Sequence, residues 1–585
     1  MRWWIEDFKG VASASVDVSP GAVTILSGVN SSGKSSLLQS LLLTAQSHYH
    51  RGAMVLNGPL TRLGSASDLV RSGARPEITK LGLSFSRDNR RYSGRRGRLQ
   101  REMWAQFHLA PSPQGTTFAL QELEVGWNGD ERASRMVLNK TYARAGDVAV
   151  IREARGEGDG TDYLHLKQAI SQGTRTLRTY IAVVGLRPVE VVQVREAEYV
   201  TRQYRRQLQT VFREFESDSD RLYESRYPPV ISEFVELLFE AHAGIDEDLP
   251  SVIEELRTAR SGNPYTFSPV WRNLSADQQG EYIEAAAVQR AKKPLIVVPL
   301  EHNVRGKYGF GSEGLLEDQL AETLGRAQLV LSSLGEALNS ITDRVQYLGP
   351  LRDEPRVVWN QWNELARGLP VGTRGEYSAV VLSRNGQKYI SYVTPEKDQR
   401  SDRLIDAVNT WLSYLEIGDK VWAENLGKLG IGLEVEVNGH RRDLTSVGVG
   451  VSQALPIVVA VLAAPLNSLF LVEQPELHLH PAVQSRLADF ILRARPDLAI
   501  VLETHSEALL TRVRRRISED DVERAKVAVT FVESSRTGSL SRDLLFNQFG
   551  DLSDWPEGFL SGIGEDTAAI VEANLQRIRR LGKDA

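Results

Sequence analysis

The chain has 585 residues, of which 41% are hydrophobic and 25% charged, a composition typical of a soluble globular protein and too apolar for a disordered one. Its 70 basic and 75 acidic side chains leave a net charge of -5, which excludes a uniformly basic nucleic-acid-binding surface but not a local basic patch. The absence of cysteine excludes disulfides, thiolate metal sites and a cysteine nucleophile.

At about 150 residues per domain, this length predicts two to four domains. The charged start MRWWIEDFKG predicts no signal peptide. The uncharged residues 454–472 are long enough to suggest a membrane span, but they contain two prolines, an asparagine and a serine. We interpret them as a buried helix, a turn and a buried strand, and therefore expect a cytoplasmic protein without membrane contact.

In chain order, strands are expected first at residues 3–17 and 22–26, followed by a glycine-rich turn and an apolar helix. Residues 81–194 alternate apolar and polar side chains, which predicts mostly sheet. From residue 199 to about 340 the spacing of apolar residues is helical, without the sustained heptads of a long coiled coil.

Strands return at Val345–Leu348 and around a hairpin turn at Asn438 and Gly439. After that turn, apolar strands and helices alternate to the end of the chain, as they do in α/β proteins.

The glycine-rich turn, GVNSSGKS, matches the phosphate-binding pattern G-x-x-x-x-G-K-[ST] and lies between an apolar strand and an apolar helix. Its glycines let backbone N–H groups point at a β-phosphate. Lys34 would neutralise the β- and γ-phosphates, and Ser35 would supply a hydroxyl to Mg²⁺. The expected nucleotide contacts are Gly28, Asn30, Ser31, Ser32, Gly33, Lys34, Ser35 and Ser36.

A second metal-binding acid is expected at the end of a neighbouring buried strand. The segment SLFLVE ends in Glu473, which we expect to hold Mg²⁺ directly or through water; an ordinary core strand with a polar end is the alternative. Two neighbours favour the metal role. A glycine-rich segment, GVGVSQ, opens a buried helix near Ser452, and His505 ends another apolar strand in IVLETHS.

The order of phosphate loop, glycine-rich helix start, acid-ended strand and histidine-ended strand is the layout of ABC-type ATPases. The segments GVNSSGKSS, GVGVSQALP, LVEQPELHLHP and ETHSEALLTRVRRRI resemble the overcome-lysogenization-defect, RecF and SMC-like branch of that group. More narrowly, VGVGVSQALPIVVA, EQPELHLHP, ETHSE and DWPEGF resemble bacterial AAA-family ATPases, some of which, including the Septu ATPase subunit, act in anti-phage systems. The resemblance covers about the first 70 residues and residues 345–559.

The resemblance implies an α/β fold with an ABC-type P-loop ATPase head split by a large insertion, because Lys34 and Glu473 lie near opposite ends of the chain. The expected division is 1–110 and 341–585 for the two parts of the head, 111–195 for a β-rich segment and 196–340 for a compact helical arm.

In this superfamily two heads sandwich two ATP molecules, each between the phosphate loop of one head and the glycine-rich helix start of the other. The resemblance therefore implies ATP, Mg²⁺ and a homodimer, or a higher oligomer built from it. The free N–H groups of a helix start suit a γ-phosphate. The expected contacts there are Gly448, Gly450, Ser452 and Gln453. The glycines precede the serine, the reverse of the usual order, and an N-capping role explains Ser452 nearly as well.

Many relatives have a glutamate after the metal-binding acid, and it activates the attacking water; this chain has Gln474. A glutamine orients water but cannot accept its proton, and losing a general base slows chemistry by roughly 10²–10⁴-fold. Glu476, two positions on, could take over this role. We hypothesise that hydrolysis is slow and that ATP holds a long-lived dimer. The resemblance assigns γ-phosphate sensing to His505; a buried structural histidine is the alternative.

Two further patterns concern metals and nucleic acid. His478 and His480 alternate as metal ligands can, but few acids complete a shell, and we favour a loop contacting a facing subunit.

An arginine-rich segment with Tyr92 predicts a hairpin that contacts a phosphate backbone, with a solvated loop or a surface for an acidic protein as alternatives. Its arginines are Arg87, Arg90, Arg91, Arg95, Arg96, Arg98 and Arg101. A second cluster at residues 512–516 would spread around a helix, so part of it is expected to be structural.

The nuclease domain that overcome-lysogenization-defect proteins carry is not expected here, because no Asp-x-Asp pair at a strand end follows His505. The favoured interpretation is a slow ATPase acting as a nucleotide-dependent dimeric switch that controls DNA binding or a separate effector nuclease in anti-phage defence. The alternatives are a RecF-like DNA-repair ATPase, a self-contained ATP-dependent nuclease, and a scaffold ATPase that binds only protein.

Overall fold

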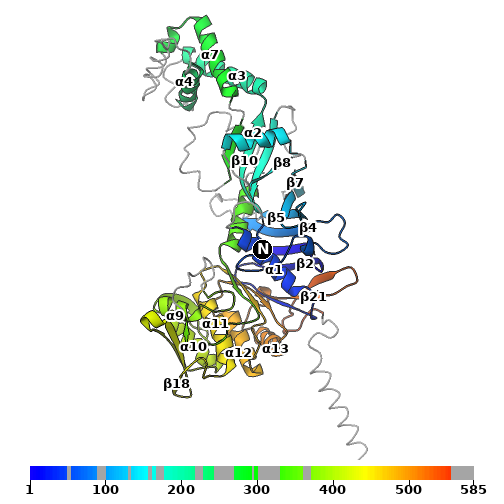
Figure 1. Cartoon of the computed structure of the whole chain (residues 1–585), viewed down its shortest axis with the longest axis vertical. Coiled ribbons are helices and arrows are strands. Elements are labelled where there is room, and N and C mark those ends of the chain that lie inside the picture. Colours follow the sequence, from blue (N-terminus) through cyan, green and yellow to red (C-terminus); the bar gives the residue numbers. More distant parts are fainter. Residues whose placement is uncertain are drawn as a thin grey trace, which may run out of the picture.

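The computed structural model is an elongated molecule with a head at one end and a helical arm at the other (Figure 1). It describes residues 1–48, 54–87, 101–128, 133–141, 143–155, 161–166, 177–217, 228–242, 269–292, 295–300, 330–359 and 371–554. Within these residues, no helix is both long enough and apolar enough to cross a lipid bilayer. The α/β fold class predicted from the sequence is confirmed, since both ends of the chain build one sheet.

This sheet has 16 strands among the described residues, in the order β11-β10-β9-β8-β7-β6-β5-β4-β1-β2-β22-β21-β3-β20-β19-β12. The first ten strands in this order are antiparallel neighbours, whereas β21, β3, β20, β19 and β12 are parallel. The strands between residues 79 and 299 are β4 Thr79–Arg87, β5 Arg101–Pro111, β6 Phe118–Asn128, β7 Ala133–Asn139, β8 Thr161–Leu166, β9 Leu177–Val184, β10 Arg187–Arg195 and β11 Leu295–Pro299. Those nearer the two chain ends are β1 Arg2–Phe8, β2 Val11–Asp17, β3 Val23–Gly28, β12 Val345–Leu348, β19 Leu469–Glu473, β20 Ala499–Glu503, β21 Val527–Glu533 and β22 Ser539–Leu544.

The parallel strands are covered on both faces, which explains why they are almost wholly apolar. On one face, α1 Lys34–His48 packs its leucines in the same core as Leu26 of β3. On the other face, Ile25 belongs to the core that contains the C-terminal helices. These helices are α9 Ser378–Asn385, α10 Leu404–Leu415, α11 Val449–Ala463, α12 Pro481–Arg493 and α13 Glu507–Ser518. The helix, turn and strand predicted within residues 454–472 are confirmed as the end of α11 and strand β19.

Two local predictions differ from the structure. The single N-terminal strand predicted at residues 3–17 is a hairpin of β1 and β2, because the chain turns at Lys9 and Gly10, and Lys9 has a φ of 53°. Within the region predicted to be helical, β11 is a strand that returns along the chain to pair with β10. Its sequence, LIVVP, is too short and too β-branched to continue a helix.

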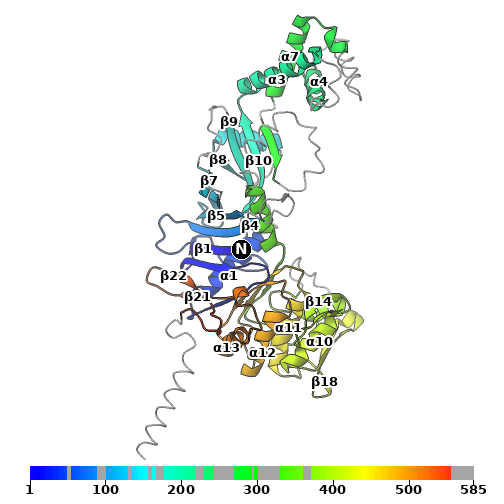
Figure 2. The same cartoon turned by 180° about the vertical axis from the view of Figure 1, so that it is seen from behind.

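The insertion continues the sheet away from the head and ends in helices, as Figure 2 shows from behind. Helix α2 Ala145–Arg155 packs Ile151 onto a small separate core on β8, β9 and β10. The described helices of the arm are α3 Ala197–Ser217, α4 Pro228–His242 and α7 Ala276–Ala291. An aromatic cluster holds the arm together, with the rings of Phe212 and Trp271 stacked at 4.1 Å and Phe234 edge-on to both.

Smaller sheets flank the C-terminal helices. One contains β13 Val358–Trp359, β17 Ile431–Val437 and β16 Lys420–Asn425, with β18 His440–Asp443 added to β17. The other is the hairpin of β14 Tyr389–Val393 and β15 Gln399–Arg403. The hairpin turn predicted at Asn438 and Gly439 is confirmed, and both residues have the positive φ that such a turn requires, 53° and 76°.

Candidate nucleotide-binding site

The site lies at one edge of the parallel sheet, where the carboxyl ends of neighbouring strands meet. In sheet order, β3 leads into the phosphate loop, β20 ends at Glu503, β19 ends at Glu473, and β12 carries Tyr347. The register places Glu473 directly beside Glu503, and Glu503 beside Leu26 of β3. Residues from both ends of the chain therefore converge on the loop after β3. This edge is the usual ligand site of open α/β sheets.

The backbone of the phosphate loop has the conformation that its glycines allow. Gly28 and Gly33 have φ values of 143° and 97°, and a Cβ on Gly28 would lie 2.1 Å from the Val532 carbonyl oxygen. Lys34 is only 3% exposed, and its Nζ donates to the carbonyl oxygens of Gly28 at 3.1 Å and Val29 at 2.8 Å. Burial lowers the pKa of Lys34, and the charge of Glu503 opposes that shift. A phosphate would offer this ammonium charged acceptors in place of neutral ones.

The remaining expected contacts of the loop differ in their exposure. Ser32 is fully buried, and its hydroxyl has no partner within the described residues, whereas Asn30 and Ser31 are exposed. Ser31 has a φ of 61°, which turns the backbone at the tip of the loop. Ser35 and Ser36 open α1 and are half-buried. The loop thus presents both a buried donor and an exposed backbone turn at the sheet edge.

The carboxylate in contact with the phosphate loop is Glu503, which the sequence analysis did not assign. The Ser35 hydroxyl lies 2.9 and 3.2 Å from its two carboxylate oxygens. Burial, and next the charge of Glu473, raises the pKa of Glu503 to about 7. A sequence signal existed: AIVLE on β20 is an apolar strand ending in a carboxylate, as is LFLVE on β19.

Glu473 occupies its expected place at the end of β19, where it is buried. The Tyr347 hydroxyl donates to its Oε1 at 2.7 Å. Burial raises the pKa of Glu473, and the Tyr347 hydrogen bond opposes this rise. Burial also raises the pKa of Tyr347, which keeps its hydroxyl a donor at neutral pH. Glu473 is therefore held from the β12 side and faces Glu503 on the β20 side.

These oxygen donors suit a hard divalent cation. Ser35, Glu503 and Glu473 offer one hydroxyl and two carboxylates, the ligands that Mg²⁺ prefers. Within the described residues, no lysine or arginine forms an ion pair with either carboxylate, and Lys34 is bonded to backbone carbonyls instead. These residues fit the Mg²⁺ expected from the sequence, and two side-by-side acids gain from a positive charge between them.

The segment after Glu473 ties the ends of β19 and β20 together. Gln474 has a φ of 43°, and its N–H donates to the Glu503 carbonyl oxygen at 2.7 Å. Glu476 is buried, and its Oε1 accepts the N–H of His505 at 2.7 Å, whereas its Oε2 has no partner among the described residues. Burial raises the pKa of Glu476. One oxygen of Glu476 is thus already used to position the His505 loop.

His505 and Arg352 complete the surroundings of the two carboxylates. The His505 side chain is exposed at the sheet edge, which rules out the buried structural histidine considered as an alternative. Partial burial, and then the charge of Lys34, lowers its pKa, so the ring is neutral at neutral pH. Arg352 is 6% exposed, and its Nη2 lies 3.4 Å from the Glu473 carbonyl oxygen. Its Nε and Nη1 have no partner in the described part of the chain, and burial lowers its pKa to about 10.

The glycine-rich helix start forms as expected, with one correction. Helix α11 begins after Gly448, and no side chain caps it. Ser452 is not the N-cap; it lies in the first turn, where its hydroxyl donates to the Val449 carbonyl oxygen at 2.8 Å. A Cβ on Gly450 would lie 3.7 Å from Leu479, so this helix start adjoins the loop that follows Glu473. Gln453 is half-buried on the same helix.

The two histidines of ELHLHP have separate surroundings. His480 caps α12, its Nδ1 accepting the N–H of Ala482 at 3.2 Å, and His478 is exposed with a φ of 61°. Neither belongs to the one group of possible metal ligands found among the described residues, which is His108, Glu122 and Glu124. Asn139 donates to Glu122 there, and Arg135 pairs with Glu124.

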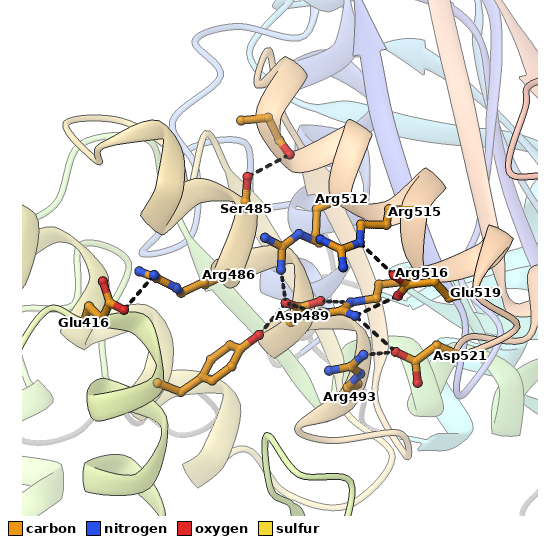
Figure 3. Close-up of polar contacts among 12 residues, drawn as sticks. Glu416, Ser485, Arg486, Asp489, Arg493, Arg512, Arg515, Arg516, Glu519 and Asp521 are labelled. Atoms are coloured by element: carbon orange, nitrogen blue, oxygen red, sulfur yellow. Dashed lines mark hydrogen bonds and ion pairs between the residues drawn. The ribbon is translucent and has the colours of Figure 1, made fainter.

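The arginine clusters have different outcomes. Arg90, Arg91, Arg95, Arg96 and Arg98 lie outside the described residues, while Arg87 and Arg101 are cross-strand partners at the ends of β4 and β5. The structural role predicted for part of the second cluster is confirmed in Figure 3. Arg512 and Arg516 both bond Asp489, a fully buried acid on α12, at 2.6 Å. Arg514 pairs with Asp551, and Arg515 with Glu519.

Comparison with known proteins gives a family match over part of the chain. Residues 321–511 match the family described as "AAA domain, putative AbiEii toxin, Type IV TA system". The matched residues include β12, β19 and β20 of the site, whereas the phosphate loop after β3 lies outside the matched range. A search of curated proteins gave no match.

Among solved structures, the chain is similar to SMC head domains. They include an Smc head with an extended coiled coil bound to the C-terminal domain of ScpA from Pyrococcus furiosus, at 12% identity and a TM-score of 0.33, covering 93% of this chain and 96% of that one. A second is an Smc head bound to the C-winged helix domain of ScpA, at 11% identity and a TM-score of 0.32, covering 94% of this chain and 98% of that one. A third is an SMC head from Thermotoga maritima, at 7% identity and a TM-score of 0.29, covering 93% of this chain and 97% of that one.

Proposed function

We propose that this protein binds and slowly hydrolyses ATP with Mg²⁺, and that the bound nucleotide switches it between a monomeric and a dimeric state. The contact of Ser35 with Glu503, beside Glu473, is the observation that carries the proposal. It brings a phosphate-binding loop against two buried acids, and this combination serves nucleotide binding with a metal. The AAA match over residues 321–511 supports the same class of ligand.

Slow hydrolysis follows from what lies after Glu473. Gln474 cannot accept a proton from the attacking water, and its backbone is already bonded to the Glu503 carbonyl. Glu476, the replacement considered from the sequence, uses one oxygen to hold the His505 backbone. The site therefore supports binding and positioning of the nucleotide better than rapid proton transfer.

A second copy of the head is the proposed dimer partner. Three apolar side chains around the site are exposed: Val29 of the phosphate loop at 53%, Leu351 after β12 at 67%, and Val449 at the start of α11 at 55%. Exposed apolar side chains next to a functional site favour a protein contact. A facing head would cover them, and its uncapped α11 would offer N–H groups to the γ-phosphate.

We propose that the dimer controls DNA binding or a separate effector nuclease in anti-phage defence. The insertion gives the head a sheet and an arm that extend away from the nucleotide, a suitable path to such a partner (Figure 1). The matched family's description, which names a putative toxin, is consistent with an effector role.

The test is the size of the purified protein with and without ATP, measured by sedimentation, alongside Lys34→Ala. We expect ATP and Mg²⁺ to convert wild-type monomers into dimers and to leave Lys34→Ala unchanged, since the variant lacks the ammonium that neutralises the phosphates. An assembly state that ignores both ATP and Lys34→Ala would refute the sandwich.

A further inference from the structure

The position of β20 gives Glu503 a place that Glu473 does not have. Strand β20 lies between β3 and β19, so the neighbour of the phosphate-loop strand is the one that ends in Glu503. Ser35 contacts Glu503 at 2.9 Å, whereas the Glu473 carboxylate accepts a hydrogen bond from Tyr347 on β12, on the opposite side of the pair. The two acids therefore have different partners although they lie side by side.

The chemistry of the Ser35 hydroxyl separates the two acids further. A serine hydroxyl has one proton to donate and lone pairs that remain free to bind a cation. With its proton directed at Glu503, Ser35 keeps those lone pairs for a metal. A carboxylate that accepts from a metal-binding hydroxyl fixes its orientation and makes its oxygen a better ligand.

We propose that Glu503 is the carboxylate that orients Ser35 for the divalent cation of bound ATP, and that Glu473, held by Tyr347, is the second carboxylate of the pair. This inference rests on the proposed nucleotide binding. It changes the expectation from the sequence, in which Glu473 alone supplied the acid. Ser35, oriented by Glu503, and Glu473 would hold the metal, so its affinity would depend on the pairing of β3 with β20, which places Glu503 beside the phosphate loop.

The experiment compares the wild type with Glu503→Gln and Glu473→Gln. ATP affinity is measured calorimetrically in EDTA and again in excess Mg²⁺, and Mn²⁺ bound with ATP is followed by its electron paramagnetic resonance spectrum. We expect Glu503→Gln to bind ATP in EDTA as the wild type does. The factor by which Mg²⁺ increases ATP affinity should be about 10- to 100-fold smaller in this variant than in the wild type.

A double-mutant cycle with Ser35→Ala tests the contact itself. We expect Ser35→Ala and Glu503→Gln together to cost no more metal-dependent affinity than Ser35→Ala alone, because Glu503 acts on the metal through the Ser35 hydroxyl. Ser35→Ala combined with Glu473→Gln should cost more than either single change. Glu503→Asp, which keeps the charge but retracts it by one carbon, should give an intermediate loss and provides a second variant if Glu503→Gln folds poorly.

The outcomes are distinguishable. A full metal-dependent gain in Glu503→Gln, with its loss in Glu473→Gln, would overturn the inference, as would a wild type that binds ATP equally well with and without Mg²⁺. A wild type that binds no ATP under any condition, like Lys34→Ala, would instead overturn the proposed function on which the inference rests.

Discussion

Two sets of buried acids in the C-terminal part of the chain, Asp489 on one side and Glu473 with Glu503 on the other, have opposite surroundings. Asp489 on α12 is fully buried and accepts hydrogen bonds from Arg512, Arg516 and the Tyr414 hydroxyl (Figure 3). Burial raises the pKa of Asp489, but these partners outweigh it, and the pKa is lowered overall. Glu473 and Glu503 are also buried, yet they lie beside each other without an ion pair among the described residues, and their pKa values are raised.

The difference shows how one head serves two purposes. Asp489 joins α12, which follows the Glu473 loop, to α13, which follows the His505 loop, so a fully paired acid fixes the layer behind the site. At the sheet edge, the two acids have no basic partner within the described residues and repel each other when ionised, and a bound metal ion would stabilise their ionised forms. The ion pairs of Asp489 thus hold two helices together, whereas the unpaired Glu473 and Glu503 are available to bind a cation.

The largest expected effect comes from breaking the paired group. Asp489→Ala leaves two half-buried guanidinium groups and a tyrosine hydroxyl without their shared, fully buried acceptor, and should lower the free energy of unfolding by about 3–5 kcal/mol. Urea denaturation followed by circular dichroism measures it. The matched control, Glu519→Ala, removes an exposed partner of Arg515 and Arg516 and should leave the curve unchanged. Equal losses in both variants would show that the buried network has no special role.

At the sheet edge, restoring a general base should raise turnover. Gln474→Glu keeps the shape of the side chain and supplies an acceptor for the water proton, so the steady-state rate of phosphate release should rise by roughly 10²-fold. Gln399→Glu, at an exposed position on β15, adds the same charge elsewhere and should change nothing. No gain in Gln474→Glu, with a wild type that is already fast, would contradict slow hydrolysis.

The two groups should also differ in how they respond to pH. The folded-state pKa of Glu503, about 7, lies above its ordinary value of 4.5, so the folded protein binds this proton more tightly than the unfolded chain does. The corresponding stability is present below about pH 4.5 and is lost as pH rises through 7. Between about pH 5 and pH 8, the metal-free wild type should lose on the order of 1–3 kcal/mol more unfolding free energy than Glu503→Gln. Parallel pH curves from urea denaturation would contradict this.

Much of this arrangement was accessible from the sequence, and the limits have physical causes. The phosphate loop, Glu473 and His505 were predictable because each ends or follows a short apolar strand with a polar residue. Glu503 also ends a short apolar strand, but the local spacing of apolar residues does not reveal the order of strands in a sheet. Only the folded sheet shows that β20 lies between β3 and β19.

Other differences arise from tertiary contacts in the same way. Strand β11 pairs with β10, far from it along the chain, and this pairing overrides the helical pattern around it. Helix α11 begins after Gly448, so Ser452 lies within its first turn and bonds the Val449 carbonyl oxygen instead of capping the helix.

The smallest expected effect comes from removing the hydrogen bond that Tyr347 donates to Glu473 but not to Glu503. Tyr347→Phe removes the donor that stabilises ionised Glu473, so the pKa of Glu473 should rise further and its share of metal binding should weaken. The metal-dependent gain in ATP affinity should fall by about 3- to 10-fold, the value of one hydrogen bond, and less than in Glu503→Gln. The control is Tyr392→Phe, which removes a hydroxyl that bonds Asp402 within the β14–β15 hairpin, away from the site. This variant should keep the full metal-dependent gain in ATP affinity. A loss in Tyr347→Phe as large as that in Glu503→Gln would mean that the metal depends on the β12 side of the pair as much as on the phosphate-loop side.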